Sequence, residues 1–259
     1  MRTADFSQVL FEALQYSGND RHNINDETFG QFRDFANARL REAWESDEWP
    51  DLCRVGQFTA VTDVNGVVSF TIVSTSDVAE ILGLFTKNPQ VTTRLQEIGY
   101  QLYDNGTSTK VIIQNSLVSD GWYHYRTKCP ALVGDLYSPS VVYFQGSQVY
   151  FDSGSGTGTY LPVSGKPHNG NFYNCIVTST VAGNSPTTNP ASWQKVSIPY
   201  AFAHYLSWGS AASWFASENL LQEAGALEAK ANERLSQEVD KIARQQNQIS
   251  KIKFINPYS

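Results

Sequence analysis

Apolar side chains near the start of the chain recur every three or four residues, which is the spacing of one face of an α-helix. The first run consists of Phe6, Val9, Leu10, Ala13 and Leu14. Thr3 or Asp5 precedes this run and can cap the helix, and Gly18 follows it as a stop. The pattern therefore predicts a short helix that ends before Gly18.

A second and longer apolar stripe follows the first. It consists of Phe29, Phe32, Ala36, Leu40, Ala43 and Trp44. Asn25 or Asp26 can cap this helix, and Pro50, which cannot continue a helix, is expected to end it. The arginine and acidic side chains of the same segment fall on other faces, so the pattern predicts an amphipathic helix.

The C-terminal part of the chain returns to the helical spacing from about Tyr200 to about Ile249. Its later apolar positions are Leu220, Ala224, Leu227, Ala231, Leu235, Val239, Ile242 and Ile249. Charged residues such as Glu228 and Lys241 occupy the remaining surface. One face of this segment is therefore expected to pack against other helices.

Between these helical regions the apolar period becomes strand-like. The segments GVVSFTIV, STKVIIQNS and GWYHYRTKC are rich in β-branched and aromatic residues. Turn-forming pieces separate them, including Val64-Asn65-Gly66 and Asp104-Asn105-Gly106. We therefore predict a small β domain over residues 55–136.

Residues 137–198 are also β-rich, but they hold few charges and many Gly, Ser, Thr, Asn and Pro residues. This change of composition predicts a separate module inserted into the chain. Gly154, Gly156 and Gly158 lack the following helix and the Lys-Ser/Thr ending of a phosphate-binding P-loop, so no nucleotide is expected there.

Together these patterns predict an α+β protein whose N- and C-terminal helices form a bundle. The expected parts are the N-terminal helices (1–54), the small β domain (55–136), the inserted module (137–198) and the C-terminal helices with a tail (199–259). The content of 41% hydrophobic and 13% aromatic residues excludes a disordered chain. No apolar run approaches the roughly 18 residues of a membrane span, and the N-terminal segment lacks the apolar core of a signal peptide. A soluble chain that is not exported is therefore expected.

Residue types that carry catalysis or bind metals are present without a convergent pattern. The candidates are Cys53, Cys129, Cys175, His22, His124, His168 and His204. The cysteines have no CxxC spacing and the histidines are solitary, so neither a disulfide framework nor a metal site is predicted. No GxSxG elbow occurs, and Asp47 with Glu48 belongs to a solvated face rather than to an acid/base pair. We therefore expect no cofactor and no enzymatic activity.

The formal net charge of −6 and the sequence pI near 5.2 limit the partners of the chain. A protein that grips nucleic-acid phosphates carries a basic surface, which this composition does not favour. Double-stranded DNA is expected at most to pass the protein without sequence-specific binding.

Two segments resemble a family of tailed-bacteriophage virion proteins, the head-to-tail connector or adaptor proteins of the neck. In the segment from Phe29 to Arg54, an arginine-rich helix runs into a Trp-x(4)-Trp-Pro-x-Leu element formed by Trp44, Trp49, Pro50 and Leu52. In the segment from Ala211 to Ile249, the matching residues are Glu238, Asp240, Lys241, Gln245 and Gln246. With the GLFTKNP and GWYHYRTKCPAL pieces, the resemblance spans most of the chain.

The resemblance implies a structural role at the head-tail junction of the virion. Connector subunits assemble in the host cytoplasm into a ring, commonly dodecameric, which joins the portal protein to tail or neck proteins and lines the DNA exit channel. It also implies that a terminal segment docks on the portal, and the residues expected to do so are Gln245, Gln246, Lys251, Lys253, Phe254 and Tyr258. The alternative interpretation of this segment is a frayed terminus.

The inserted module resembles the small aromatic β module of the chitin-binding type, on the residues Tyr173, Cys175, Pro190 and Trp193. This implies an alternative function as a glycan-binding tail accessory or tail-fibre-associated virion protein, with Tyr173 and Trp193 as glycan contacts. A third alternative, a wall-degrading enzyme, lacks a recognisable pair of carboxylates.

The chain departs from the sugar-binding version of this module at its front aromatic residues. These are Tyr143, Phe144, Tyr150 and Phe151, which alternate as in a strand. Such residues can form the core of the module instead of a ligand platform.

Overall fold

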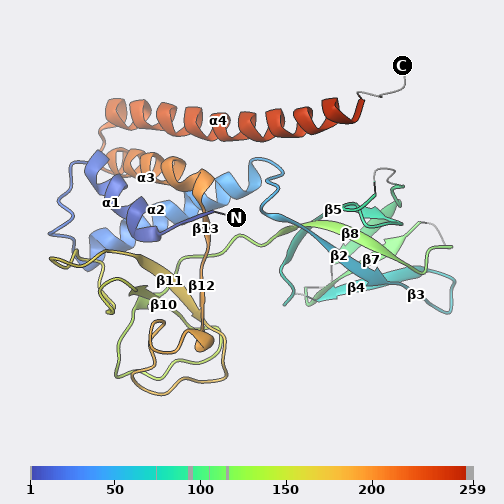
Figure 1. Cartoon of the computed structure of the whole chain (residues 1–259), viewed down its shortest axis with the longest axis horizontal. Coiled ribbons are helices and arrows are strands. Elements are labelled where there is room, and N and C mark those ends of the chain that lie inside the picture. The colour runs from blue at the N-terminus through green and yellow to red at the C-terminus, as the bar shows by residue number, and fades with distance from the viewer. Residues whose placement is uncertain (1, 74, 93–95, 105, 115–116, 255–259) are drawn as a thin grey trace. The chain divides into compact units, whose positions relative to one another are not determined.

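The chain folds into a mixed α+β protein, as the sequence predicts, with helices and β-sheets in separate stretches (Figure 1). The computed structural model describes residues 2–73, 75–92, 96–104, 106–114 and 117–254, with side chains described up to residue 244. Within these residues, no helix is both long enough and apolar enough to cross a membrane.

Residue contacts divide the chain into two units. The first, which we call the helical unit, combines Met1–Asp47 with Pro130–Ser259. The second, the β unit, is the single segment Glu48–Cys129. The β unit therefore interrupts the helical unit in the sequence.

The helical unit is built around one central helix. Its described α-helices are α1 (Phe6–Tyr16), α2 (Asp26–Glu45), α3 (Ala203–Ser217) and α4 (Leu221–Phe254), with short 3-10 helices η1 (Pro190–Ser192) and η2 (Tyr200–Phe202). Helix α3 contacts α1, α2 and α4, and it lies between α4 and the two N-terminal helices (Figure 1). Leu206, Ala211 and Ala212 of α3 are buried, as expected for a helix that packs on several sides.

The two N-terminal helices confirm the apolar pattern, because all the predicted stripe residues of both are buried. The Asn25 side chain caps α2 by accepting a hydrogen bond from the Thr28 N–H at 2.7 Å. Gly18, with φ of 74°, follows α1 in the left-handed region, which glycine adopts without a steric penalty. Side-chain spacing and capping residues thus sufficed to locate these helices.

Two helix boundaries differ from the prediction. Helix α2 ends at Glu45 rather than at Pro50, and the Ser46 hydroxyl donates a hydrogen bond to the Ala43 carbonyl near this end. The predicted helical region from Tyr200 is broken between α3 and α4, where Asn219 has a φ of 62°. Asparagine is one of the few residues that adopt this left-handed conformation readily, and it turns the chain back along α3.

The sheet of the helical unit follows the order β12-β11-β10-β9. Its strands are β9 (Asp135–Leu136), β10 (Gln148–Asp152), β11 (Gly170–Cys175) and β12 (Trp193–Lys195). Strands β10 and β11 pair antiparallel, with Tyr150 opposite Phe172, whereas β9 pairs parallel to β10. A two-stranded ladder between β1 (Thr3–Ala4) and β13 (Ile198–Pro199) joins the N-terminus to the chain before α3.

Both faces of this sheet are buried, and each has a different partner. On one face, Tyr150 and Phe172 pack against Phe6 of α1 and Phe29 of α2, with ring centroids 5.0 to 6.5 Å apart. The other face carries Val149, Phe151, Cys175 and Trp193, which pack under the module's own loops.

Residue contacts do not set residues 137–198 apart as they set the β unit apart, and the predicted separable module stays a prediction. They share an aromatic interface with α1 and α2, and residue contacts group them with the helices. Composition did not indicate this, because the aromatic residues that face the helices alternate along β10 and β11 with those that face the loops.

The β unit consists of two antiparallel sheets. One has the order β2-β8-β5 and the other β3-β4-β7-β6. The strands are β2 (Cys53–Thr59), β3 (Val61–Thr62), β4 (Val68–Val73), β5 (Val78–Phe85), β6 (Tyr100–Asp104), β7 (Ser108–Ile113) and β8 (Asp120–Thr127). The three predicted strand segments are confirmed as β4, β7 and β8, and the predicted turn at Gly66 is present with φ of 79°.

The core of the β unit lies between its own sheets. It contains Phe58, Val68, Phe70, Ile81, Leu84, Ile98, Val111 and Ile113. The Phe58 and Phe70 rings stack with centroids 4.4 Å apart. Residue contacts give this unit as Glu48–Cys129, whereas residues 55–136 were expected from composition. The residues just before β2 group with the sheets of this unit, and residues 130–136, after β8, group with the helical unit.

Candidate functional site

The predicted portal-docking residues fall at the end of α4 and beyond it. The chain from Gln245 to Phe254 continues α4, but its side chains lie outside the described part of the structure. Thus Gln245, Gln246, Lys251, Lys253 and Phe254 are placed only by their backbone, and Tyr258 lies outside the described residues. The docking role of these residues stays a prediction.

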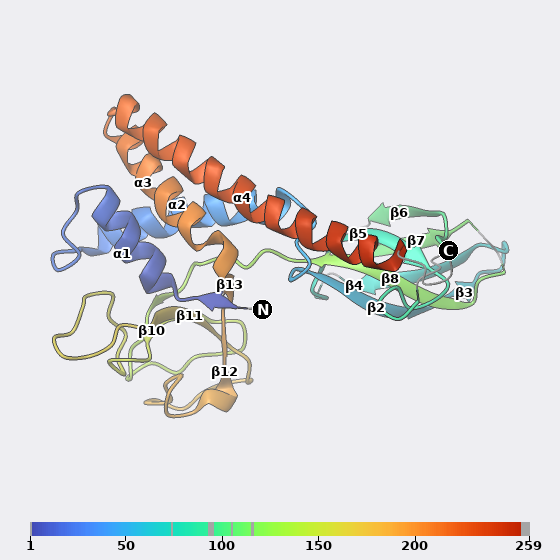
Figure 2. The ribbon, with the colours of Figure 1, turned by 45° about the horizontal axis from the view of Figure 1, so that its top comes forward.

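The described part of α4 has the expected apolar stripe. Ala224 and Ala231 are buried, and the half-buried positions are Leu227, Leu235, Val239 and Ile242. Leu220 differs, because it lies in the turn before α4 and is exposed. Helix α4 has 34 residues and α3 has 15, and α4 runs past the end of α3 (Figure 2).

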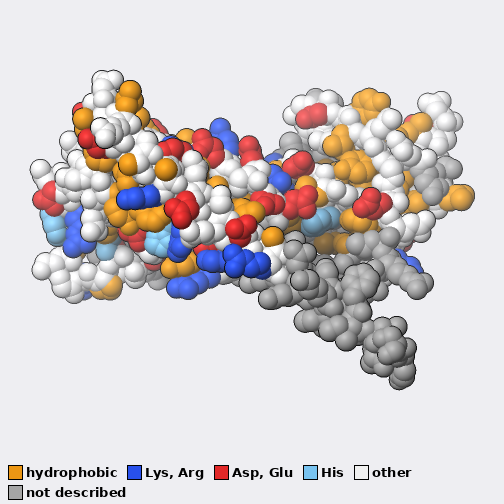
Figure 3. Space-filling view, turned by 90° about the horizontal axis from the view of Figure 1, so that it is seen from above, with side chains coloured by type: hydrophobic (Ala, Val, Ile, Leu, Met, Phe, Trp, Pro, Cys, Tyr) orange, Lys and Arg blue, Asp and Glu red, His pale blue; other side chains and the backbone are white. Residues whose placement is uncertain are grey.

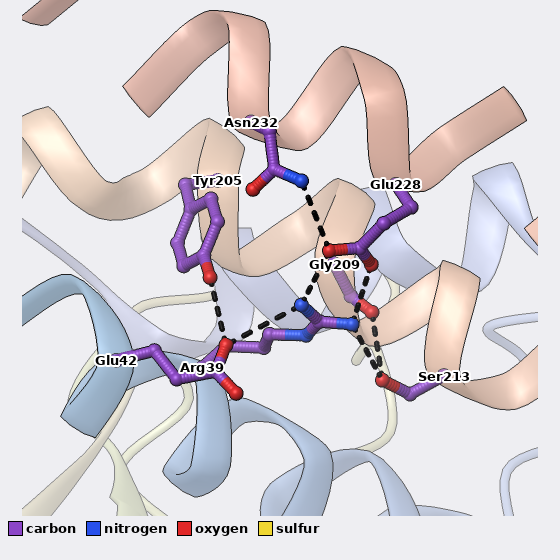
Figure 4. A network of polar contacts seen from close by, with 7 residues as sticks. All are labelled: Arg39, Glu42, Tyr205, Gly209, Ser213, Glu228 and Asn232. Atoms are coloured by element: carbon purple, nitrogen blue, oxygen red, sulfur yellow. Dashed lines mark hydrogen bonds and ion pairs between the residues drawn. The ribbon is translucent and has the colours of Figure 1, made fainter. Parts of the chain in front are cut away.

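A polar network links α2 to α4 across α3 (Figure 4). The guanidinium of Arg39 on α2 donates two hydrogen bonds to the Glu228 carboxylate on α4, at 2.8 and 2.6 Å. It also donates to the Ser213 hydroxyl of α3 at 3.3 Å. This fork-to-carboxylate geometry is the strongest form of ion pair that side chains make, so one residue holds three helices together.

Gly209 of α3 leaves room for the Arg39 side chain to pass close to the α3 backbone. A Cβ atom at Gly209 would lie 3.0 Å from Cδ and Nε of Arg39, so any larger residue would displace the arginine. Glu42, one turn after Arg39, accepts a hydrogen bond from the Tyr205 hydroxyl at 2.8 Å. The position of Gly209 next to Arg39 could not be read from a sequence, since the two belong to helices far apart in the chain.

The electrostatics of this network favour the charged arginine. Burial alone would lower the pKa of Arg39, but hydrogen bonds with Glu228 and Tyr205 outweigh it and raise that pKa. Burial also raises the pKa of Tyr205 to about 12; its hydrogen bond to Glu42 acts in the same direction and Arg39 opposes it. The network thus favours the charged form of Arg39 and acts as a structural clamp.

A second cluster joins α1 to strand β11. Phe6 is the first residue of α1, where a backbone N–H has no acceptor within the helix, and its N–H donates to Asn171 Oδ1 at 2.9 Å. The Gly170 N–H donates to the Ser7 hydroxyl at 3.0 Å, and Lys195 Nζ lies 2.6 Å from Asp5 Oδ1. Asp5 occupies the N-cap position but makes no capping bond itself, so Asn171 serves as a cap supplied from another element.

His168 is not solitary, which corrects the prediction from sequence. Its Nδ1 lies 2.7 Å from Asp152 Oδ2, and its ring stacks on Phe11 of α1 with centroids 4.7 Å apart. Burial lowers the pKa of His168, and the attraction of Asp152 opposes this only in part. Backbone N–H groups of Asn169 and Gly154, each 2.9 Å away, hold the pKa of Asp152 below its usual value although its burial acts the other way.

This His-Asp pair is enclosed rather than open to a substrate. Asp152 has no exposed surface, and the His168 side chain is 9% exposed. His204 also has an acidic neighbour, because its Nδ1 lies 3.5 Å from Glu12 Oε2. Over the described residues, no three His, Cys, Asp or Glu side chains gather as metal ligands would, and no disulfide joins the three cysteines.

The two predicted glycan contacts lie in the interior of the module. Trp193 is 5% exposed, its ring meets Tyr137 and Tyr143 edge to face, and its indole N–H donates to the Asn184 carbonyl at 3.1 Å. Tyr173 is half-buried against Phe151, and burial raises its pKa. A glycan role of these two residues stays an untested prediction.

The front aromatic residues of the module behave mainly as core. Tyr150 and Phe151 are fully buried and Tyr143 packs against Trp193, whereas Phe144 is exposed. This agrees with their strand-like alternation in the sequence. The one exposed ring among them lies beside an isolated bridge to Ser179.

Acidic and basic side chains are interspersed over the face of the helical unit that Figure 3 shows. No large area of one charge gathers on this face of the described residues. Comparison of the chain with models of known protein families and with curated proteins gives no match.

Proposed function

We propose that the chain is a structural subunit of a phage head-to-tail connector ring, which joins the portal to the tail and lines the DNA exit channel. In this proposal it belongs to the virion, is assembled in the host cytoplasm and contributes contacts rather than catalysis. The support from sequence is the resemblance of the residues around the end of α2 and along α4 to connector proteins.

The first resembling element joins α2 to the start of the β unit. Trp44 is buried on α2, where its ring meets Phe202 edge to face at 6.3 Å. Trp49 and Leu52 are buried in the β unit, and the Leu52 carbonyl accepts hydrogen bonds from the Thr127 N–H and hydroxyl at 2.9 and 3.1 Å. These large apolar residues therefore pack each in its own unit, on either side of the boundary between the two units.

The observation that carries the proposal is the length and patterning of α4. At about 1.5 Å per residue, its 34 residues span about 51 Å, whereas the 15 residues of α3 span about 22 Å. The apolar stripe continues through Leu235, Val239 and Ile242, which keep part of their surface exposed. In the proposed ring, the N- and C-terminal helices form a bundle and this stripe meets the next subunit.

A ring of this kind needs two different complementary surfaces on each subunit, related by a rotation that closes. The clamp formed by Arg39 and Glu228 supports this use, because it fixes α4 on α2 and α3 before any neighbour binds. The net charge of −6 suits a channel through which DNA slides without being retained.

The direct test is the position of the protein in purified phage particles. An affinity tag inserted beside Val181, which is 71% exposed, should be seen by electron microscopy at the head-tail junction. Particles made without the protein should be DNA-filled heads that lack tails. A label at the tail tip or on fibres would contradict the connector proposal and favour the tail accessory.

The role of α4 in ring formation has its own test. Leu235→Arg combined with Val239→Arg should abolish rings of the purified protein in negative stain, while circular dichroism still shows the helices. Ser236→Arg, at an exposed position of the same turn, is the matched control and should leave the rings intact. Rings that persist in the double variant would show that this stripe is not the subunit contact.

A further inference from the structure

Backbone hydrogen bonds join the two sheets of the β unit along only part of the line between β5 and the segment that contains β6, and we call this line the seam. At the end of β5, the Ile98 N–H donates to the Leu84 carbonyl at 2.9 Å, and the Thr86 N–H donates to the Gln96 carbonyl at 3.2 Å. An isolated bridge pairs Phe85 with Glu97 between these bonds. Here the segment that leads into β6 acts as a neighbouring strand of β5.

Beyond this point the seam opens. The Tyr100 hydroxyl donates to the Ile81 carbonyl at 3.0 Å, so a side chain takes the place of a strand neighbour. From there β5 and β6 border a cavity of about 570 Å³. Its lining includes Ile72, Glu80, Ile81, Leu102, Asp104 and Lys128, and we call this cavity the seam groove.

Apolar side chains in the seam groove continue the rows that build the core. Side chains alternate between the faces of a strand, so Leu102 follows Ile98 and Tyr100 on the core-facing side. Ile98 is buried, but Leu102 is 48% exposed. A core-facing row that ends in an exposed leucine indicates that a further segment can cover it.

The groove also has two strand edges. Among the described strands, β5 is the last of its sheet and β6 is the last of the other. An edge strand offers backbone N–H and C=O groups to any extended chain that lies beside it. Addition of a peptide strand to such an edge, with alternate side chains in apolar pockets, is a common mode of protein recognition.

The charges around the groove favour a basic segment. Its lining contains the carboxylates of Glu80 and Asp104 and the ammonium of Lys128. Burial raises the pKa of Tyr100, and the negative charges of Glu80 and Glu97 act in the same direction. Glu80 also pairs with the Arg126 guanidinium at 3.5 Å.

The chain itself contains a segment with the complementary pattern. Residues 251–256 read Lys-Ile-Lys-Phe-Ile-Asn, so that an extended conformation would place Ile252 and Phe254 on one face and Lys251 and Lys253 on the other. The backbone of Lys251–Phe254 forms the last turn of α4, and helix ends fray readily. Because α4 runs past α3, this segment lies at the end of a long arm.

We propose that the seam groove binds the C-terminal segment of a second copy of the chain, residues 251–256, as an added strand between β5 and β6. Ile252 and Phe254 enter the groove beside Leu102 and Ile72, and the lysines lie on the opposite face, on the side of Glu80. The proposal requires the chain to assemble with itself, as in the ring proposed above, but it does not require a phage particle. It also gives the terminal segment a partner other than the portal.

The first experiment measures binding of a fluorescent peptide with the sequence of residues 250–259 to the full chain that lacks those residues. Saturable binding is expected, and Leu102→Lys should weaken it by at least about tenfold, because a buried leucine contact is lost and a like charge is added. Val64→Lys, at a fully exposed turn of the same unit, is the matched control and should bind like the parent. Absence of binding, or equal binding by Leu102→Lys, would overturn the proposal.

The second experiment asks whether the segment acts between copies. One protein keeps its C-terminal segment but carries Leu102→Lys, and the other keeps the groove but lacks residues 250–259. Both proteins also carry Leu235→Arg and Val239→Arg, which remove the α4 contact of the ring proposed above. Each alone should then stay monomeric, and the mixture should form a one-to-one complex by light scattering. A mixture that stays monomeric, even where the free peptide binds the groove, would show that the segment does not act between copies and that the proposal is wrong.

Discussion

The chain contains two β-rich regions of similar size that bury their apolar residues in different ways. The β unit keeps its core between its own two sheets, around Phe58 and Phe70. The sheet of residues 135–195 has no second sheet; one face packs on helices α1 and α2, and the other packs under loops. Whether a β-rich segment can fold by itself therefore depends on which residues cover the faces of its sheet, and not on how β-rich the segment is.

The largest effect is expected from deleting each region. Removal of residues 137–198 leaves Phe6 and Phe29 of the helices without their aromatic partners, so we expect the helices to lose cooperative folding. Composition alone predicted the opposite, a helical protein that survives the deletion. Circular dichroism with thermal melting decides between the two, since a sharp helical transition in the deletion variant would restore the separate-module interpretation.

The corresponding prediction for the β unit is that it folds without the rest of the chain. A fragment of residues 48–129 should fold by itself, because its core residues belong to that segment. The measurement is dispersion of amide signals in an NMR spectrum of the fragment. An unfolded fragment would show that this unit depends on the rest of the chain.

Single substitutions in the two cores should separate the units further. Phe172→Ala removes a ring that contacts Phe6, Phe29 and Tyr150, and should lower the free energy of unfolding of the helical unit by about 3–5 kcal/mol. Phe70→Ala should instead destabilise the β unit. If both substitutions shift a single common transition in calorimetry, the two units do not unfold independently.

A smaller effect is expected at the clamp of the helical unit. Arg39→Ala leaves Glu228 without its partner, and since Glu228 is about one third exposed, we expect a loss of about 1–2 kcal/mol. A double-mutant cycle with Glu228→Gln should show that most of this loss is shared by the pair. Arg41→Ala, at an exposed position on α2, is the control and should change stability by less than about 0.5 kcal/mol.

Each unit also has a histidine whose pKa burial lowers from the usual 6.5, His168 in the helical unit and His124 in the β unit. The unfolded chain takes up a proton at higher pH than the folded chain does. The corresponding stability is therefore complete above about pH 6.5 and declines as the pH falls toward the lower folded pKa. His168→Gln should flatten this dependence for the helical unit only, as measured by urea unfolding between about pH 7 and pH 5. An unchanged slope would mean that His168 keeps its proton affinity on folding.

The smallest effect is expected for sugar binding. Because Trp193 is buried and its indole N–H is already bonded, insoluble chitin should retain little of the protein. A saturable pull-down that Trp193→Ala removes without unfolding the chain would contradict this and would revive the tail-accessory function.

The sequence predicted helices and strands better than it predicted which of them pack against one another. Periodicity located α1 and α2, and β-branched and aromatic runs located β4, β7 and β8, because each depends on residues within a short segment. It also identified the stripe of α4. The break at Asn219 was missed, since the helical pattern continues on both sides of a residue that changes only the direction of the chain.

The polar sites could not be predicted for a related reason. Arg39 and Glu228 lie 189 positions apart, and nothing near either residue indicates the other. Asp152 and His168 are closer in sequence, but a histidine in a Gly- and Ser-rich loop carries no signal of its burial. Such pairs depend on the tertiary fold, which a single sequence does not specify residue by residue.

The capping of α1 by Asn171 has a consequence for how the protein is made. The first helix reaches its capping residue, and β1 its partner β13, only after the ribosome has produced most of the chain. The β unit is one continuous segment and can fold while the later residues are still being translated. We therefore expect nascent chains to hold a finished β unit after N-terminal helices that are still unpaired, whose apolar stripes stay open to chaperones until helix α3, which ends at Ser217, has emerged.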